Sequence, residues 1–113
     1  MENSNKHTDL GYLNQLANGS DEFVNKMTGI FLDQTPEALE NLDKHLAAKD
    51  WKALRGTAHK MKSSLSIMGI KELEPIVADI EDFCDKEINL DKVPALVEQV
   101  KSVCREAMEE LRV

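Results

Sequence analysis

The strongest constraint on the fold is a run of apolar residues between positions 51 and 68 that recurs at the period of an α-helix. Successive members are 3, 4, 3, 4 and 3 residues apart, which places them all on one side of a helix. Asp50 is placed to cap the start of this helix and Gly69 to end it. Such a helix needs other elements to cover its apolar side. The apolar residues are Trp51, Leu54, Ala58, Met61, Leu65 and Met68.

Two helices are predicted before position 50. A short one is expected from about Thr8 to Leu16, with residues 10, 13 and 16 as its apolar side, and Asn18-Gly19 ends it. Ser20 is a typical N-cap for the next helix. Thr35-Pro36 then leaves two possibilities: a new helix starts there with Pro36 in its first turn, or one long helix bends.

Two further helices are predicted after position 70. Apolar residues recur at helical spacing over 73–84 and again over 93–111, with a turn at 89–91 between them. Nothing in the sequence predicts a strand, since there is no sustained alternation and no Asn-Gly or Asp-Gly turn. Short connections favour antiparallel neighbours. We therefore expect an all-α fold, an antiparallel four-helix bundle with a short additional N-terminal helix packed across one end.

The length of 113 residues predicts a single domain spanning 1–113. There is no run of about 18 apolar residues that could span a membrane, and residues 1–6 do not resemble a signal peptide. We therefore expect a cytoplasmic protein. Cys84 and Cys104 fall on apolar helical stripes, which favours buried reduced thiols over a disulfide.

The charge distribution is uneven. A net charge of −7 argues against nucleic acid as a partner. Residues 51–71 nevertheless contain five basic residues and no Asp or Glu, whereas the rest of the chain holds all 21 acidic residues. This segment indicates a local site for an anion or an acidic partner, although chance variation on a solvated helix face would look the same.

The polar side of the 51–68 helix displays a histidine with a distinctive neighbourhood. If the apolar stripe points inward, His59 points outward, with Arg55 four residues before it and Lys62 and Ser63 three and four residues after it. An exposed neutral imidazole can act as a nucleophile. Phosphoryl transfer requires mainly positioning and neutralisation of oxygen charge, which Lys62 could supply.

Small residues extend this surface. Gly56 and Ser66 lie on the same strip, and glycine inside a helix is unfavourable by about 1 kcal/mol relative to alanine. Gly56 and Ser63 would let the surface of another protein approach the imidazole of His59.

Residues 58–69, AHKMKSSLSIMG, resemble the signature of the histidine-containing phosphotransfer (HPt) domain of two-component phosphorelays. That signature has a lysine three residues after the histidine, a small residue four after and a glycine ten after, which Lys62, Ser63 and Gly69 match. Serine at position 63 is a mild departure, because the family often has glycine there. The resemblance implies that His59 accepts a phosphoryl group from an aspartyl phosphate on a receiver domain and passes it to another receiver.

The resemblance has further implications. The family commonly has a polar residue on the following helix that orients the imidazole, and by spacing this is Glu81; a solvated Glu81 beside Asp82 is the alternative. The chain should need no cofactor of its own, because Mg²⁺ belongs to the receiver and no Gly-rich phosphate loop is present. We expect a monomeric phosphoryl carrier without an autokinase site, whose partners are response-regulator receivers. A hybrid sensor histidine kinase is a further candidate partner.

The sequence leaves three alternatives to this function. A metal site is not predicted, because the histidine and cysteine spacings match no ligand pattern. A histidine-kinase dimerisation domain usually has an acidic residue directly after its histidine, whereas Lys60 follows His59 here. The remaining alternative is a non-catalytic adaptor bundle that binds a signalling partner without accepting phosphate.

Overall fold

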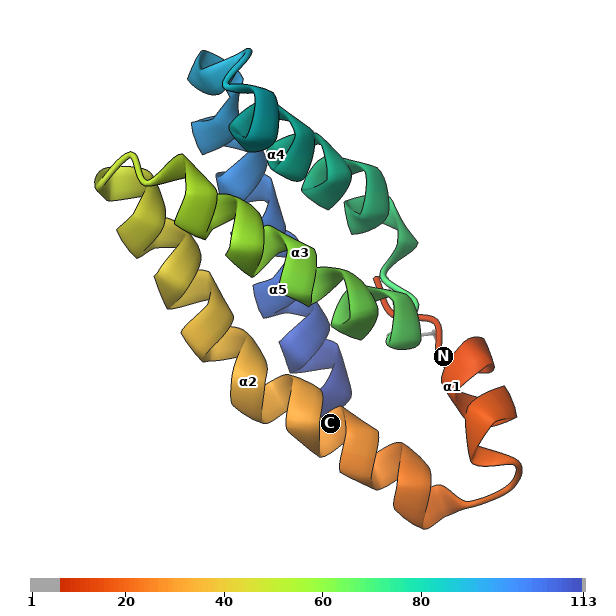
Figure 1. Cartoon of the computed structure of the whole chain (residues 1–113). Helices are drawn as coiled ribbons and strands as arrows, with labels where there is room; N and C mark the ends of the chain where they lie inside the picture. Colours follow the sequence, from red (N-terminus) through yellow and green to blue (C-terminus); the bar gives the residue numbers. More distant parts are fainter. Residues whose placement is uncertain (1–6, 113) are drawn as a thin grey trace.

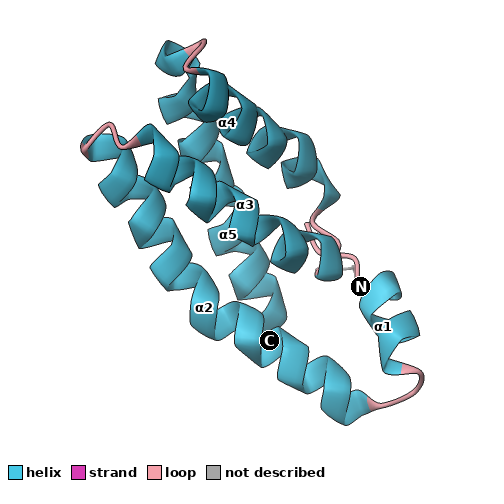
Figure 2. Ribbon diagram, in the orientation of Figure 1, coloured by secondary structure: helices cyan, strands magenta, loops and turns pink. Residues whose placement is uncertain are grey.

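The computed structural model describes residues 7–112, which form helices and connecting turns with no strand among them (Figure 2). Two single 3₁₀ turns, η1 and η2, precede the last two helices. The elements are α1 (Gly11–Ala17), α2 (Asp21–Ala47), α3 (Trp51–Ile67), η1 (Lys71–Leu73), α4 (Glu74–Lys86), η2 (Leu90–Lys92) and α5 (Val93–Arg112).

Helices α2 to α5 form an antiparallel four-helix bundle (Figure 1). Helix α3 contacts α2 on one side and α4 on the other, and α5 packs against both α2 and α4, so each helix has two neighbours. The short α1 packs on the N-terminal part of α2 at one end of the bundle. The predicted fold class is confirmed.

The core is built from the apolar sides that the sequence pattern predicted. Leu42 of α2, Leu54 of α3, Ile80 of α4 and Val100 of α5 are all completely buried. Burial of such a side chain stabilises the fold by about 1.5–3 kcal/mol. No helix within residues 7–112 is both long and apolar enough to cross a membrane.

The N-caps that the sequence predicts for α2 and α3 are both present. Ser20 Oγ accepts a hydrogen bond of 3.2 Å from the Phe23 N–H at the start of α2. Asp50 Oδ1 accepts one of 3.1 Å from the Ala53 N–H at the start of α3. Each cap satisfies an otherwise unpaired donor and contributes about 1 kcal/mol.

The first helix differs from the prediction. It begins at Gly11 and not at Thr8, because the N–H and hydroxyl of Thr8 both donate to the carboxylate of Glu110 at the other end of the chain. Leu16 does not belong to its buried side, being 48% exposed, whereas Ala17 is buried. The contact between Thr8 and Glu110, and not the local helical pattern, thus determines where α1 begins.

Pro36 does not separate two helices. It lies inside the continuous helix α2, although it lacks the N–H that would bond to the carbonyl four residues earlier. Thr35, the alternative cap, is buried instead of standing at a helix start.

Gly69 ends α3 as expected and has a second role. Its φ of +69° lies in the left-handed region that glycine tolerates best. A Cβ at this position would overlap the backbone of Asp9, which crosses the end of α3 and donates a 3.1 Å hydrogen bond to the Met68 carbonyl. Only glycine allows this close approach.

Candidate functional site

Helix α3 presents His59 outward, as its register predicted. The His59 side chain is 68% exposed, whereas Ala58 and Met61 on the opposite side of the helix are buried in the core. The imidazole therefore stands in solvent on a helix whose rotation is fixed by its buried side.

Glu81 of α4 reaches the imidazole from the neighbouring helix. Its Oε2 lies 2.6 Å from His59 Nδ1, and its Oε1 lies 2.8 Å from Lys62 Nζ. The Lys62 ammonium, which hydrogen-bonds the carboxylate, lowers the pKa of Glu81, and the bond with His59 adds to this against the opposing effect of partial burial. Glu81 is thus an ionised acceptor held between two donors.

This contact determines which ring nitrogen is available. A carboxylate only accepts hydrogen bonds, so Nδ1 of His59 must carry the proton that it shares with Glu81. In the neutral imidazole, the unprotonated nitrogen is then Nε2. The exposed ring presents its lone pair away from α4.

Arg55 lies on the same strip but pairs elsewhere. Its Nε lies 3.4 Å from Asp85 Oδ1 on α4, and Lys86 pairs with Asp82 at 3.0 Å along the same helix. Helix α4 therefore supplies the carboxylates that segment 51–71 lacks. These carboxylates partly neutralise the positive charge around His59. The site is therefore less basic than segment 51–71 alone indicated.

The small residues of the strip leave space above the helix. Ser63 and Ser66 are exposed, and a Cβ placed on the half-buried Gly56 would meet no atom within 4 Å. The fold itself does not require glycine at position 56.

A family model, the Hpt domain, matches residues 26–113, which include all of α3, α4 and α5. The chain belongs to the Hpt domain family. It is a histidine phosphotransfer protein of phosphorelays, a class whose members exchange phosphoryl groups with receiver domains of response regulators. The non-catalytic adaptor is not favoured.

A solved relative supports the same assignment. The chain is similar to histidine-containing phosphotransfer protein B (HptB) from Pseudomonas aeruginosa PAO1, whose crystal structure it matches with a TM-score of 0.84. The two share 27% sequence identity, over 95% of this chain and 92% of the other. No curated protein sequence gives a significant match.

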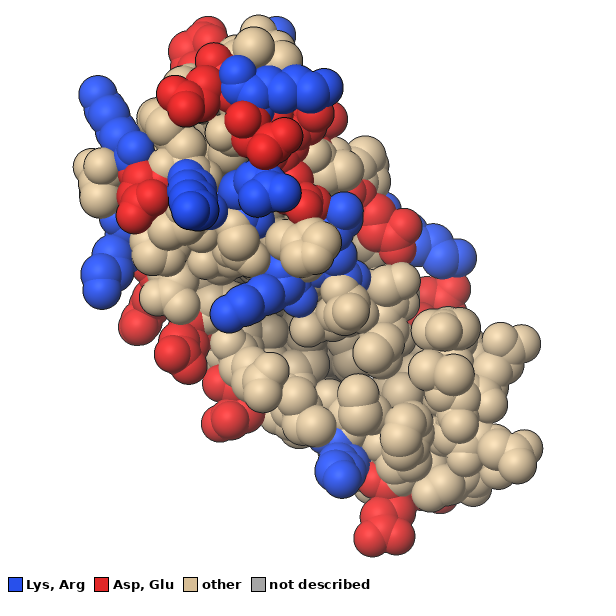
Figure 3. Space-filling model, viewed as in Figure 1, with Lys and Arg blue, Asp and Glu red and all other residues tan. Residues whose placement is uncertain are grey.

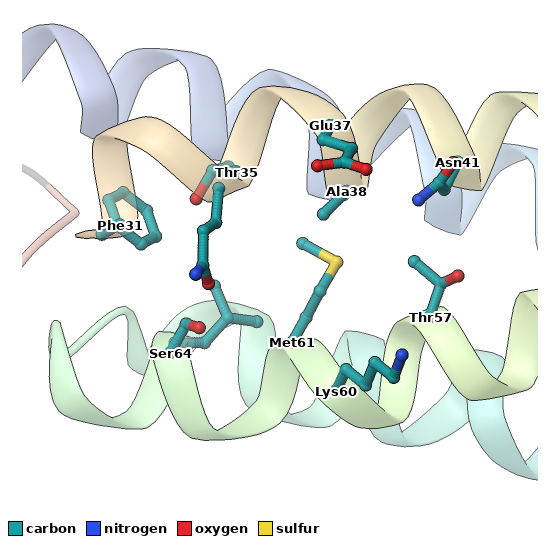
Figure 4. Close-up of a pocket in the computed structure, with 11 residues that line it drawn as sticks. Phe31, Thr35, Glu37, Ala38, Asn41, Thr57, Lys60, Met61 and Ser64 are labelled. Atoms are coloured by element: carbon teal, nitrogen blue, oxygen red, sulfur yellow. The ribbon is translucent and has the colours of Figure 1, made fainter. Parts of the chain in front are cut away.

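The exposed side of α3 that carries His59 is called the ridge below. In this Hpt domain a hollow of about 330 Å³ lies between α2 and α3, beside the ridge (Figure 4). The side chain of Met61 points across it toward α2, with Ala38 opposite. Lys60 and Thr57 line it from α3, and Asn41 lines it from α2. The floor is therefore partly apolar and the rim is polar.

A second, smaller hollow of about 200 Å³ lies on the other side of the ridge, between α3 and α4. Lys62 and Ser66 contribute to it from α3, and Glu74 and Val77 from α4. The exposed side of α3 thus has a hollow on each flank, one beside Thr57 and Lys60 and the other beside Lys62 and Ser66, a shape that the sequence did not predict.

The charge pattern of this face is visible in Figure 3. Lysine and arginine side chains gather over α3, and acidic side chains lie beside them over α4. The region over α1, which contains no charged residue, is uncharged. The uncharged region over α1 thus lies apart from the charged surface over α3 and α4.

Two features of the site escaped the sequence reading. Asp85 was not singled out, although it lies four residues after Glu81 and so on the same face of α4. The double contact of Glu81 was also missed, since only its orientation of the imidazole was considered. The i, i+4 spacing on α4 was the available signal for Asp85.

Proposed function

We propose that His59 is the phosphoryl-accepting residue of this Hpt domain and that its Nε2 is the reacting atom. The observation that carries this is the exposed ring whose Nδ1 is held by Glu81. The remaining lone pair on Nε2 is the nucleophile available to a partner.

The transfer has two halves. Nε2 attacks the phosphorus of a receiver aspartyl phosphate, the N–P bond forms, and the P–O bond to the aspartate breaks so that a free carboxylate leaves. In the second half, the carboxylate of another receiver attacks the same phosphorus and the N–P bond breaks. The chain provides position and charge, and Mg²⁺ on the receiver is the only metal that the scheme requires.

Lys62 neutralises oxygen charge on the phosphoryl group in this scheme. Its Nζ is 2.8 Å from Glu81 and half exposed, one helical turn from His59. Glu81 orients the ring and keeps the ammonium close to it. The three residues thus act as one unit, in which His59 is the nucleophile, Glu81 the orienting carboxylate and Lys62 the cation.

The receiver would dock over the ridge and its two flanking depressions. Gly56, Ser63 and Ser66 allow close approach, and Arg55 with its Asp85 partner borders the contact. Gly69 acts only structurally, at the end of α3. We further propose that the chain acts as a monomer, as a single domain over residues 1–113, in the cytoplasm.

The direct experiment is label transfer from a phosphorylated receiver domain. Parent protein and His45→Gln, which changes an α2 histidine away from the site, should both acquire acid-labile, alkali-stable label. His59→Gln should acquire none. Equal labelling of His59→Gln and parent would contradict the proposal.

A further inference from the structure

His7, which the phosphotransfer site does not use, is held between two carboxylates. Its Nδ1 lies 2.7 Å from Glu72 Oε1 on η1, and its Nε2 lies 2.6 Å from Glu106 Oε1 on α5. The side chain is 14% exposed. Two elements far apart in the sequence are thus joined through one imidazole.

A third carboxylate completes the cluster. Glu110 of α5 accepts hydrogen bonds from the backbone N–H of His7 at 3.0 Å and from the N–H and hydroxyl of Thr8. At the edge of the cluster, Lys71 Nζ lies 4.0 Å from Asp9 Oδ2. Three carboxylates therefore face a single histidine.

This arrangement requires a second proton on the ring. A neutral imidazole has one N–H, whereas both nitrogens of His7 contact oxygens that only accept when ionised. The hydrogen bond to Glu72 is the largest cause that raises the pKa of His7, with Glu106 and Glu110 adding to it and burial opposing it. Only the imidazolium donates to both partners at once.

The residues that follow His7 cross the end of α3. The Asp9 N–H donates to the Met68 carbonyl, and Gly69 leaves room for this backbone. Met68 and Ile70, which lie at the same crossing, are almost completely buried. Residues 7–9 thus form an N-terminal strap that connects α1 to the ends of α3 and α5.

We propose that His7 is a proton-operated clasp that fastens the N-terminal strap to the bundle when its imidazole is doubly protonated and releases it when the proton leaves. Because the pKa of His7 is raised on folding, the fastening is complete below about pH 6.5, the ordinary histidine value, as long as Glu72 and Glu106 stay ionised. It is lost as pH rises through the higher pKa of the folded state. This regulation is separate from phosphoryl transfer at His59.

The test compares the full-length parent with His7→Gln, which cannot bind the second proton. Urea unfolding midpoints at pH 6 should show the parent clearly more stable than His7→Gln, and this gap should narrow at pH 9. His45→Gln, the control, should track the parent at both pH values. A gap that is the same at pH 6 and pH 9 would overturn the clasp.

A second measurement needs no variant. In the parent, NMR titration of the His7 ring should give a midpoint above 6.5, and exchange protection of the Asp9 amide, corrected for intrinsic rates, should fall over the same pH range. A midpoint at or below 6.5, or protection that does not change with pH, would refute the proposal.

Discussion

Nδ1 of His59 lies 2.6 Å from Oε2 of Glu81, a residue 22 positions later in the chain and on a different helix. The orientation of the imidazole therefore depends on how α3 packs against α4. Core residues such as Leu54 and Ile80, which are completely buried, fix that packing. The geometry of the His59–Glu81 pair at the surface is therefore set by the packing of α3 against α4 in the core.

Two substitutions at Glu81 distinguish the effect of its contact with His59 from that of its contact with Lys62. Glu81→Gln retains an oxygen that can accept from Nδ1 of His59 but loses the charge that holds Lys62. Glu81→Ala loses both. We expect transfer by Glu81→Ala to be slowed by about tenfold, the effect of about 1.4 kcal/mol, with most of the rate restored in Glu81→Gln. Single-turnover transfer from a phosphorylated receiver measures this, and equal rates for Ala and Gln would argue against ring orientation.

Lys62→Ala should give a folded protein with slow transfer. The side chain is half exposed, so the fold loses only a surface ion pair. Loss of a charge-assisted contact to the phosphoryl group should lower the rate about ten- to a hundredfold. Lys26→Ala is the matched control, since this exposed lysine lies near the start of α2 and lines neither hollow. An unchanged rate in Lys62→Ala would remove Lys62 from the mechanism.

Gly56→Ala should stabilise the protein and impair its function. A Cβ there meets no atom within 4 Å, and alanine is favoured over glycine in a helix by about 1 kcal/mol. The methyl group would stand where the partner approaches, so transfer should slow. Gly29 of α2 is equally open and provides the control: Gly29→Ala should raise the unfolding midpoint without slowing transfer. If both variants transfer at the parental rate, close approach at Gly56 is not needed.

The two cysteines should be inert in the folded protein. Burial raises the pKa of Cys84 to about 11 and that of Cys104 to about 12. At pH 8 both are therefore thiols, and both are shielded from solvent. Iodoacetamide should modify them quickly in urea and very slowly in buffer, as mass spectrometry would show. Rapid modification of either residue in buffer would contradict this.

The four bundle helices could be predicted from sequence because each carries an apolar stripe and two begin with a side-chain cap. The spacing of the apolar residues in α3 determines which side of the helix turns inward, so the sequence alone places His59, Lys62 and Ser63 outward on one face. The caps at Ser20 and Asp50 are local, since each bonds to an N–H three residues later.

What depended on contacts between distant segments could not be predicted. The start of α1 is set by the bond of Thr8 to Glu110, more than 100 positions away. The sequence shows charge only along the chain, whereas Arg55 of α3 is neutralised by Asp85 of the neighbouring helix α4. The spacing predicted that Glu81 lies near His59, but it did not predict the second contact of Glu81, with Lys62.

The central claim, that the phosphoryl group resides on Nε2 of His59, can be measured directly. Protein labelled with ¹⁵N in its histidine rings would be phosphorylated by a receiver, and NMR would identify the nitrogen bonded to phosphorus. The structure predicts an N–P bond at Nε2 of His59 alone, with Nδ1 still protonated. A bond at Nδ1, or at His7 or His45, would contradict it.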